Sequence, residues 1–185
     1  MSSDPSKTII GVVCKNGIVL AINELNHHFF YVGNAIYFCS ENQPSHRDAL
    51  MAICKKLEEY SLKSYTKMTV EAVVSGVVKE EYEQLNKKEL LLAGLDSKGL
   101  HLYAFYPLCG CSSVKFVALG ERSKKMNKYL KKKWNADLDL KLGEELARKA
   151  FHLGLTDKAS DNSKMEIGII YMKLKKDDDE FNECF

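Results

Sequence analysis

The sequence predicts an α+β fold built from antiparallel sheets and helices. The first observation is an opening pair of short strands, Thr8–Cys14 and Ile18–Ile22, rich in Val, Ile and Thr. Their apolar residues hardly alternate, so both faces of this hairpin are expected to be covered. The second is the order of expected elements, which is strands, two helices, three strands, two helices and a final strand. This order suits two sheets packed face to face with helices outside both.

Each expected element has its own signal in the sequence. Asn16-Gly17 should supply the positive φ angles of a tight hairpin turn. Strands are expected at 28–32, 35–39, 89–95, 100–106, 114–119 and 166–173. Helices are expected at 44–60, 70–85, 121–134 and 139–153, where apolar residues recur at helical spacing. In the last helix this spacing places Leu142, Leu146, Ala150 and Leu153 on the buried face.

Length and composition indicate one domain, residues 8–173, between a short extension, 1–7, and a polar tail, 174–185. The net charge of +2 gives no overall bias toward nucleic acid or anionic lipid. The lysine cluster from Lys124 to Lys133 is interpreted as a solvated helix face, and the acidic run Asp177–Glu180 as a solvated or partner-contacting segment. No apolar run reaches the length of a membrane span, and the start lacks a signal-peptide core.

The six cysteines lie mostly in apolar segments, without the spacing of a disulfide framework. Cys109-Gly-Cys111 lacks a second pair and is expected in a loop, so neither a metal nor another cofactor is predicted. His27 and His28 beside Cys39 could suggest a catalytic Cys–His pair, but a Cys and a His on neighbouring strands are common by chance. The expected compartment is the reducing cytosol or the nucleus.

Four collinear motifs resemble β-type proteasome subunits, which have an N-terminal-nucleophile hydrolase fold. They are TIIGVVCKNGIVLAIN from Thr8, LLLAGLDSKGLHLYAFYP from Leu90, KFVALGERS from Lys115 and GLTDKASDNSKMEIGII from Gly154. The opening hairpin is most similar to the trypsin-like type, numbered second among these subunits. The resemblance implies a four-layer αββα sandwich, in which two antiparallel sheets are flanked by helix pairs.

In this family the nucleophile is the hydroxyl of an N-terminal Thr, activated by its own α-amino group. A Lys, an acidic residue and a backbone N–H near a Gly complete the site. Aligned on the hairpin, the nucleophile position falls on Lys7, the acidic position on Asn23 and the basic position near His28. No lysine occurs between Lys15 and Lys55, and the expected Gly-x-Gly is Ser40-Glu41-Asn42. The catalytic set is therefore predicted to be degenerate.

Two alternatives concern the same site. A one-residue shift would make Thr8 the nucleophile after processing, but it would turn every side chain of the strand to the opposite face. Asp157 and Ser160 have the spacing with which the family supports its N-terminus, although an ordinary loop explains them equally well. Glu121 in GERS, like Asp161, replaces a small residue of the family pattern.

The resemblance thus implies a non-catalytic, structural β-type subunit of the proteasome core particle, which supports ATP- and ubiquitin-dependent protein degradation. Its expected partners are other α- and β-type subunits in a hetero-oligomeric ring, with no nucleic acid and no membrane. An active threonine endopeptidase exposing Thr8 and a free-standing regulator with the same fold are the alternatives.

Overall fold

The computed structural model describes most of the elements that the sequence predicts. The described residues are 8–23, 27–31, 36–41, 69–76, 89–106, 110–120, 122–154 and 167–173, with nine further positions between 48 and 63. Those nine positions are all helical and exposed, consistent with the helix expected at 44–60. The apolar positions expected to be buried on that helix, and residues 77–85 of the next helix, lie outside the described residues.

Two antiparallel sheets form the centre of the molecule. The first has the strand order β8-β1-β2-β9, with β1 (Thr8–Cys14), β2 (Gly17–Asn23), β8 (Phe116–Gly120) and β9 (Ile167–Lys173). The second has the order β3-β4-β5-β6-β7, with β3 (His27–Tyr31), β4 (Ile36–Glu41), β5 (Leu90–Asp96), β6 (Gly99–Tyr106) and β7 (Gly110–Ser113). In the second sheet the strand order follows the chain, whereas in the first sheet β8 and β9 lie beside β1 and β2, from which they are distant in sequence.

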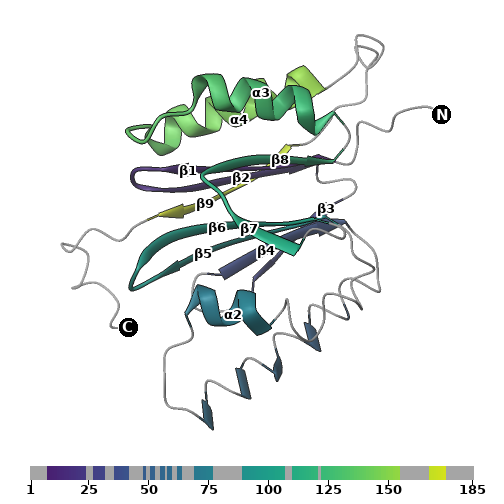
Figure 1. Cartoon of the computed structure of the whole chain (residues 1–185), viewed down its shortest axis with the longest axis vertical. Coiled ribbons are helices and arrows are strands. Elements are labelled where there is room, and N and C mark those ends of the chain that lie inside the picture. Colours follow the sequence, from purple (N-terminus) through teal and green to yellow (C-terminus); the bar gives the residue numbers. More distant parts are fainter. Residues whose placement is uncertain are drawn as a thin grey trace, which may run out of the picture.

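Helices cover the outer faces of both sheets, as Figure 1 shows. The helices α3 (Ser123–Lys133) and α4 (Leu140–Gly154) lie over the first sheet, and α2 (Val70–Gly76) lies against the second. Thr69 Oγ1 accepts the Ala72 N–H at 3.2 Å and so caps α2. The expected four-layer α+β sandwich is confirmed.

Strand β1 contributes side chains to two different cores. Ile9 packs between the two sheets, with Cys39, Leu91 and Leu102 in the same cluster. Its neighbour Ile10 packs beneath the helices, with residues of α3 and α4. This alternation explains why nearly every residue of the hairpin is apolar, because each face of the first sheet is buried against a different layer.

The turn between β1 and β2 differs in detail from the expectation. Cys14 pairs with Gly17, so the loop consists of Lys15 and Asn16. Among the described residues, positive φ angles occur at Gly99, Gly110, Gly120 and Arg122, and therefore not at Asn16 or Gly17. Asn16 acts through its side chain instead, because its Oδ1 accepts the Leu140 N–H at 3.0 Å where α4 begins.

Strand β7 was not expected from the sequence. Cys111 and its neighbours form this edge strand of the second sheet, in which Cys111 pairs with Phe105, rather than a loop. The sequence Gly-Cys-Ser-Ser has neither alternating apolar residues nor β-branched residues, so no local sequence feature predicts a strand here. Pairing with β6 supplies the order that its own propensity does not.

The buried face of α4 is rotated from the predicted one. Leu146 and Ala150 are buried as expected, but Leu142 is 49% exposed and Leu153 is only partly buried. Gly143, Ala147, Phe151 and Gly154 are buried in their place. A Cβ on Gly143 would lie 2.3 Å from the Cys14 sulfur, so the small residue lets α4 approach the sheet closely.

Candidate functional site

Two of the predicted site positions, Thr8 and Asn23, lie at the end of the first sheet opposite the β1–β2 turn. Ile9 pairs with Ile22, which places the start of β1 beside the end of β2. Thr8 pairs with Gly120 at the end of β8, and Asn23 pairs with Ile167 at the start of β9. The ends of four strands therefore meet where the family's chemistry would be located.

Thr8 is part of the sheet and has almost no contact with solvent. It is 3% exposed, and its pair with Gly120 is the last of the β1–β8 ladder, which begins with the pair of Val12 and Phe116. Side chains alternate along a strand, so Thr8 shares a face with Ile10 and Val12, which pack beneath the helices. This places Thr8 on the helical side of the sheet rather than between the sheets. Lys7 lies outside the described residues.

The other two degenerate positions are located by the backbone alone. Asn23 is the last residue of β2, and His28 pairs with Ser40 between β3 and β4. Ser40 is buried, at 2% exposure, and belongs to the segment where the family pattern has Gly-x-Gly. Asp157, Ser160 and Glu121 lie outside the described residues, so their roles stay predictions.

A carboxylate that the sequence did not single out lies at the same end. Glu89, directly before β5, accepts the Gly120 N–H on its Oε2 at 2.5 Å. This bond joins the start of a strand in the second sheet to the end of a strand in the first. Burial, and then the charge of Glu89, raises the pKa of Tyr106. The only sequence feature that could have pointed to Glu89 is its position as a charged residue directly before an apolar run.

The turn that leads into α3 also departs from the family text. Arg122 directly precedes α3, and its φ of 63° is in the left-handed region. A non-glycine residue there costs on the order of 1–2 kcal/mol. The Arg122 Nη1 donates to the Gly154 carbonyl at 3.3 Å, which ties the start of α3 to the end of α4.

Cysteine chemistry finds no support in the described residues. Cys39 is fully buried between the sheets, and desolvation raises the pKa of its thiol far above the ordinary value. Burial, and then the charge of Asp139, raises the pKa of Cys14 to about 11. A nucleophilic cysteine needs a lowered pKa instead. Within the described part of the chain, no cluster of three or more His, Cys, Asp or Glu residues could hold a metal ion.

Comparison with known proteins decides the family. The model of the family described as "Proteasome subunit" matches residues 44–170, well over half of the chain. The chain belongs to the proteasome subunit family. It is also 24% identical over 178 residues to a protein named proteasome subunit beta from Methanosphaera stadtmanae, covering 88% of this chain and 85% of that relative.

The family and the observed sandwich confirm the β-type proteasome resemblance and the fold that it implied. Membership links the chain to a threonine-protease complex assembled from proteasome subunits. None of the described helices is both long enough and apolar enough to cross a bilayer.

Proposed function

We propose that this chain is a non-catalytic β-type subunit that fills a place in a ring of the proteasome core particle. Its role would be to hold neighbouring α- and β-type subunits and to wall the proteolytic chamber. The observation that carries the proposal is the placement of Thr8, which is buried and turned toward the helices. The residue before it is Lys7, which has no hydroxyl.

The alternation of β1 supports the absence of a threonine nucleophile. Ile9 faces the space between the sheets, and an odd-numbered position preceding it would share that face in a continued strand. A nucleophile directed at a substrate between the sheets would therefore be expected at position 7. Cleavage before Thr8 would expose an amine, but the hydroxyl would still lie on the helical side.

The remaining positions support the same proposal through their chemistry. Asn23 cannot carry the negative charge that keeps a catalytic lysine placed, and no lysine follows in the sequence until Lys55. Restoring activity would require a nucleophile, an acid and a base together. We further propose that the chain is most similar to the trypsin-like type of β subunit, with a degenerate catalytic site. It would take part in ATP- and ubiquitin-dependent protein degradation in the cytoplasm and the nucleus.

The test is native purification of the tagged chain, followed by size-exclusion chromatography, subunit identification and N-terminal sequencing. The proposal predicts elution with the assembled particle and an N-terminus upstream of Thr8. A mature chain beginning at Thr8 would favour an active endopeptidase. Elution of the chain apart from all other proteasome subunits would favour a free-standing regulator.

A further inference from the structure

The helix layer over the first sheet is far more basic than the rest of the chain. Residues 122–154, which contain α3 and α4, have ten Lys and Arg against four Asp and Glu, a net charge of +6. The whole chain has a net charge of only +2, so all other residues together carry −4. Such a one-sided distribution of charge favours association with a partner of opposite charge.

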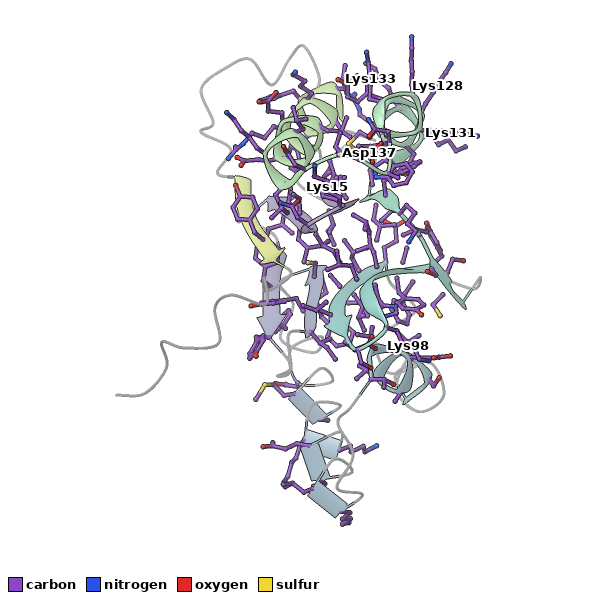
Figure 2. The ribbon with its side chains drawn as sticks, turned by 90° about the vertical axis from the view of Figure 1, so that its left-hand side faces the viewer. Lys15, Lys98, Lys128, Lys131, Lys133 and Asp137 are labelled. Carbon is purple, nitrogen blue, oxygen red and sulfur yellow. The ribbon has the colours of Figure 1, made fainter. Side chains whose placement is uncertain are left out.

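The excess positive charge is concentrated on α3. This helix has no acidic residue, and in the described part of the chain none of its lysines takes part in an ion pair. Figure 2 shows Lys128 and Lys131 pointing away from the fold. All six lysines are exposed, and they are Lys124, Lys125, Lys128, Lys131, Lys132 and Lys133.

The four acidic side chains of the helix layer do not compensate these lysines. Two of them form ion pairs within α4, and a third accepts a backbone N–H where α4 begins. The fourth lies in the exposed connection between the helices, without an ion pair to any described residue. In this order they are Glu144 with Arg148, Glu145 with Lys149, Asp139 with the Leu142 N–H, and Asp137.

Three of the six lysines oppose the local preferences of a helix. The N-terminus of a helix is the positive end of its dipole, yet Lys124 and Lys125 lie in the first turn of α3. Lys128 is four residues from both Lys124 and Lys132, and like charges at this spacing repel each other on a helix surface. Folding of the chain alone does not explain these positions, so they indicate a contact with another molecule.

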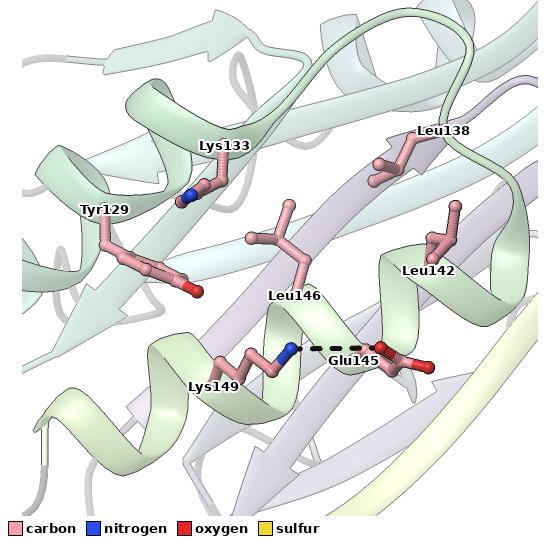
Figure 3. A pocket seen from close by; sticks show the side chains of 7 residues that line it. All are labelled: Tyr129, Lys133, Leu138, Leu142, Glu145, Leu146 and Lys149. Atoms are coloured by element: carbon pink, nitrogen blue, oxygen red, sulfur yellow. Dashed lines mark ion pairs between the residues drawn. The ribbon is translucent and has the colours of Figure 1, made fainter.

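A groove between α3 and α4 borders the lysines (Figure 3). Its apolar lining consists of Leu138, Leu142, Leu146 and Tyr129, and Leu142 is 49% exposed. The volume of the groove is about 240 Å³. Small-molecule pockets typically measure ~300–1,000 Å³, so an apolar side chain of a partner fits this groove better than a free ligand does.

The two rims of the groove differ in charge. On the α4 side Glu145 and Lys149 both line the groove and lie 3.9 Å apart, so this rim is close to neutral. On the α3 side Lys133 lines the groove, and no described acidic residue pairs with it. A partner's carboxylate is therefore attracted toward α3 and repelled by Glu145.

We propose that α3 and the adjoining groove form an interface for an acidic surface of a protein partner. The partner's Asp and Glu side chains lie over Lys124, Lys128 and Lys131, and one of its apolar side chains packs on Leu142 and Tyr129. A second copy of the chain cannot bind through the same face, because two lysine-rich helices repel each other. Nucleic acid would match the lysines but not the leucines. The inference does not depend on the proposed ring position or on the absence of catalysis.

Binding of defined probes to the full chain at physiological salt tests the proposal. The first probe is a polyglutamate peptide with one central Phe, the second has Ala in place of Phe, and the third is a short duplex DNA. The Phe peptide should bind about three- to tenfold more tightly than the Ala peptide, because its ring enters the groove. Equal binding of the two peptides would overturn the proposal. Tighter binding of the DNA than of the Phe peptide would overturn it in favour of a nucleic-acid surface.

Paired charge reversals separate the interface from the net charge. K124E/K128E should weaken binding of the Phe peptide by about fivefold or more, since two contacting lysines are reversed. K15E/K115E changes the net charge equally at exposed lysines outside the helices and should weaken binding by less than about twofold. Equal losses in the two variants would overturn the proposal, because they would show attraction to net charge alone.

Thermal unfolding of the single variant K124E shows whether the lysine serves folding or binding. Its Tm should rise by about 1–3 °C, because Glu in the first turn suits the helix dipole and attracts Lys128. The same variant should bind the Phe peptide more weakly than the parent does. A fall in Tm would show that Lys124 supports the fold, and the proposal that it is placed for a partner would be overturned.

Discussion

Glu89 accepts the backbone N–H of Gly120 at 2.5 Å and thereby fastens one sheet to the other. The bond lies at the end where Thr8 pairs with the same Gly120. Glu89 and Gly120 therefore form a structural junction between the two sheets. The predictions below test this junction, the packing that surrounds it and the absence of catalysis.

Glu89→Ala should destabilise the fold. The Gly120 N–H would lose a charged acceptor in a partly buried place, which costs about 1–3 kcal/mol. Urea unfolding measures the change, and Glu89→Gln should lose less because it keeps an acceptor. Glu71→Ala is the matched control, since its pair with Lys98 is exposed and should matter little. Equal effects of the Glu89 and Glu71 substitutions to Ala would refute the junction.

Asn127→Ala should also lower stability. The side chain of Asn127 donates to the Ala118 carbonyl and accepts the Ala118 N–H, both at 2.8 Å, and so joins α3 to β8. Losing both bonds costs about 2 kcal/mol, or about 4–8 °C in Tm for a chain of this size. Calorimetry should detect this shift, whereas Asn135→Ala, at an exposed loop position, should leave Tm nearly unchanged.

Gly143→Ala should be unfavourable even though alanine favours helices. The added Cβ would meet the Cys14 sulfur at 2.3 Å, and overpacking costs about 1–3 kcal/mol. Cys14→Ala in the same chain should restore much of this loss, because the sulfur is removed. Chemical denaturation of both single variants and the double variant measures the coupling. Strict additivity of the two changes would contradict the close approach.

Asp96 should make stability depend on acid pH. Burial opposes its ionisation, but N–H groups of Val70 and Lys98 and the ring of His101 outweigh burial and lower the pKa of Asp96. A lowered folded-state pKa adds stability above the unfolded value of about 3.9, and this stability is lost as pH falls through the folded pKa. Asp96→Asn should therefore be less stable than the parent at pH 7, by about 1–2 kcal/mol.

The pH dependence of that difference is the decisive part. Unfolding of both chains is measured at neutral pH and at several acidic values. The difference in unfolding free energy between the parent and Asp96→Asn should narrow as Asp96 of the parent is protonated. It should vanish once Asp96 is protonated in both the folded and the unfolded state. A difference in unfolding free energy that stays constant down to the lowest pH measured would show that the charge of Asp96 contributes nothing to stability.

The sequence predicts the layered fold well because local signals agree with it. The β-branched residues of β1 and β2 are buried on both faces of the sheet, and the continuous run of apolar residues in the sequence predicts this burial directly. Strand β7 could not be foreseen, because its order comes from pairing with β6. The rotated face of α4 likewise depends on the contact of Gly143 with Cys14, which are far apart in sequence.

The candidate site is predictable only in part. Lys7, Asn23 and His28 follow from alignment of the sequence on the hairpin, and their assignment as degenerate site positions stays a prediction. Glu89 could not be found this way, because its partner lies 31 residues further along the chain. The burial of Thr8 also required the structure, since it depends on the helices above the sheet.

The most direct test of the central claim is covalent labelling of the assembled particle with an inhibitor that reacts with an N-terminal threonine. Intact-mass analysis of this subunit should show no adduct and an N-terminus that precedes Thr8, while catalytic subunits of the same particle are labelled. A stoichiometric adduct on Thr8 would contradict the account.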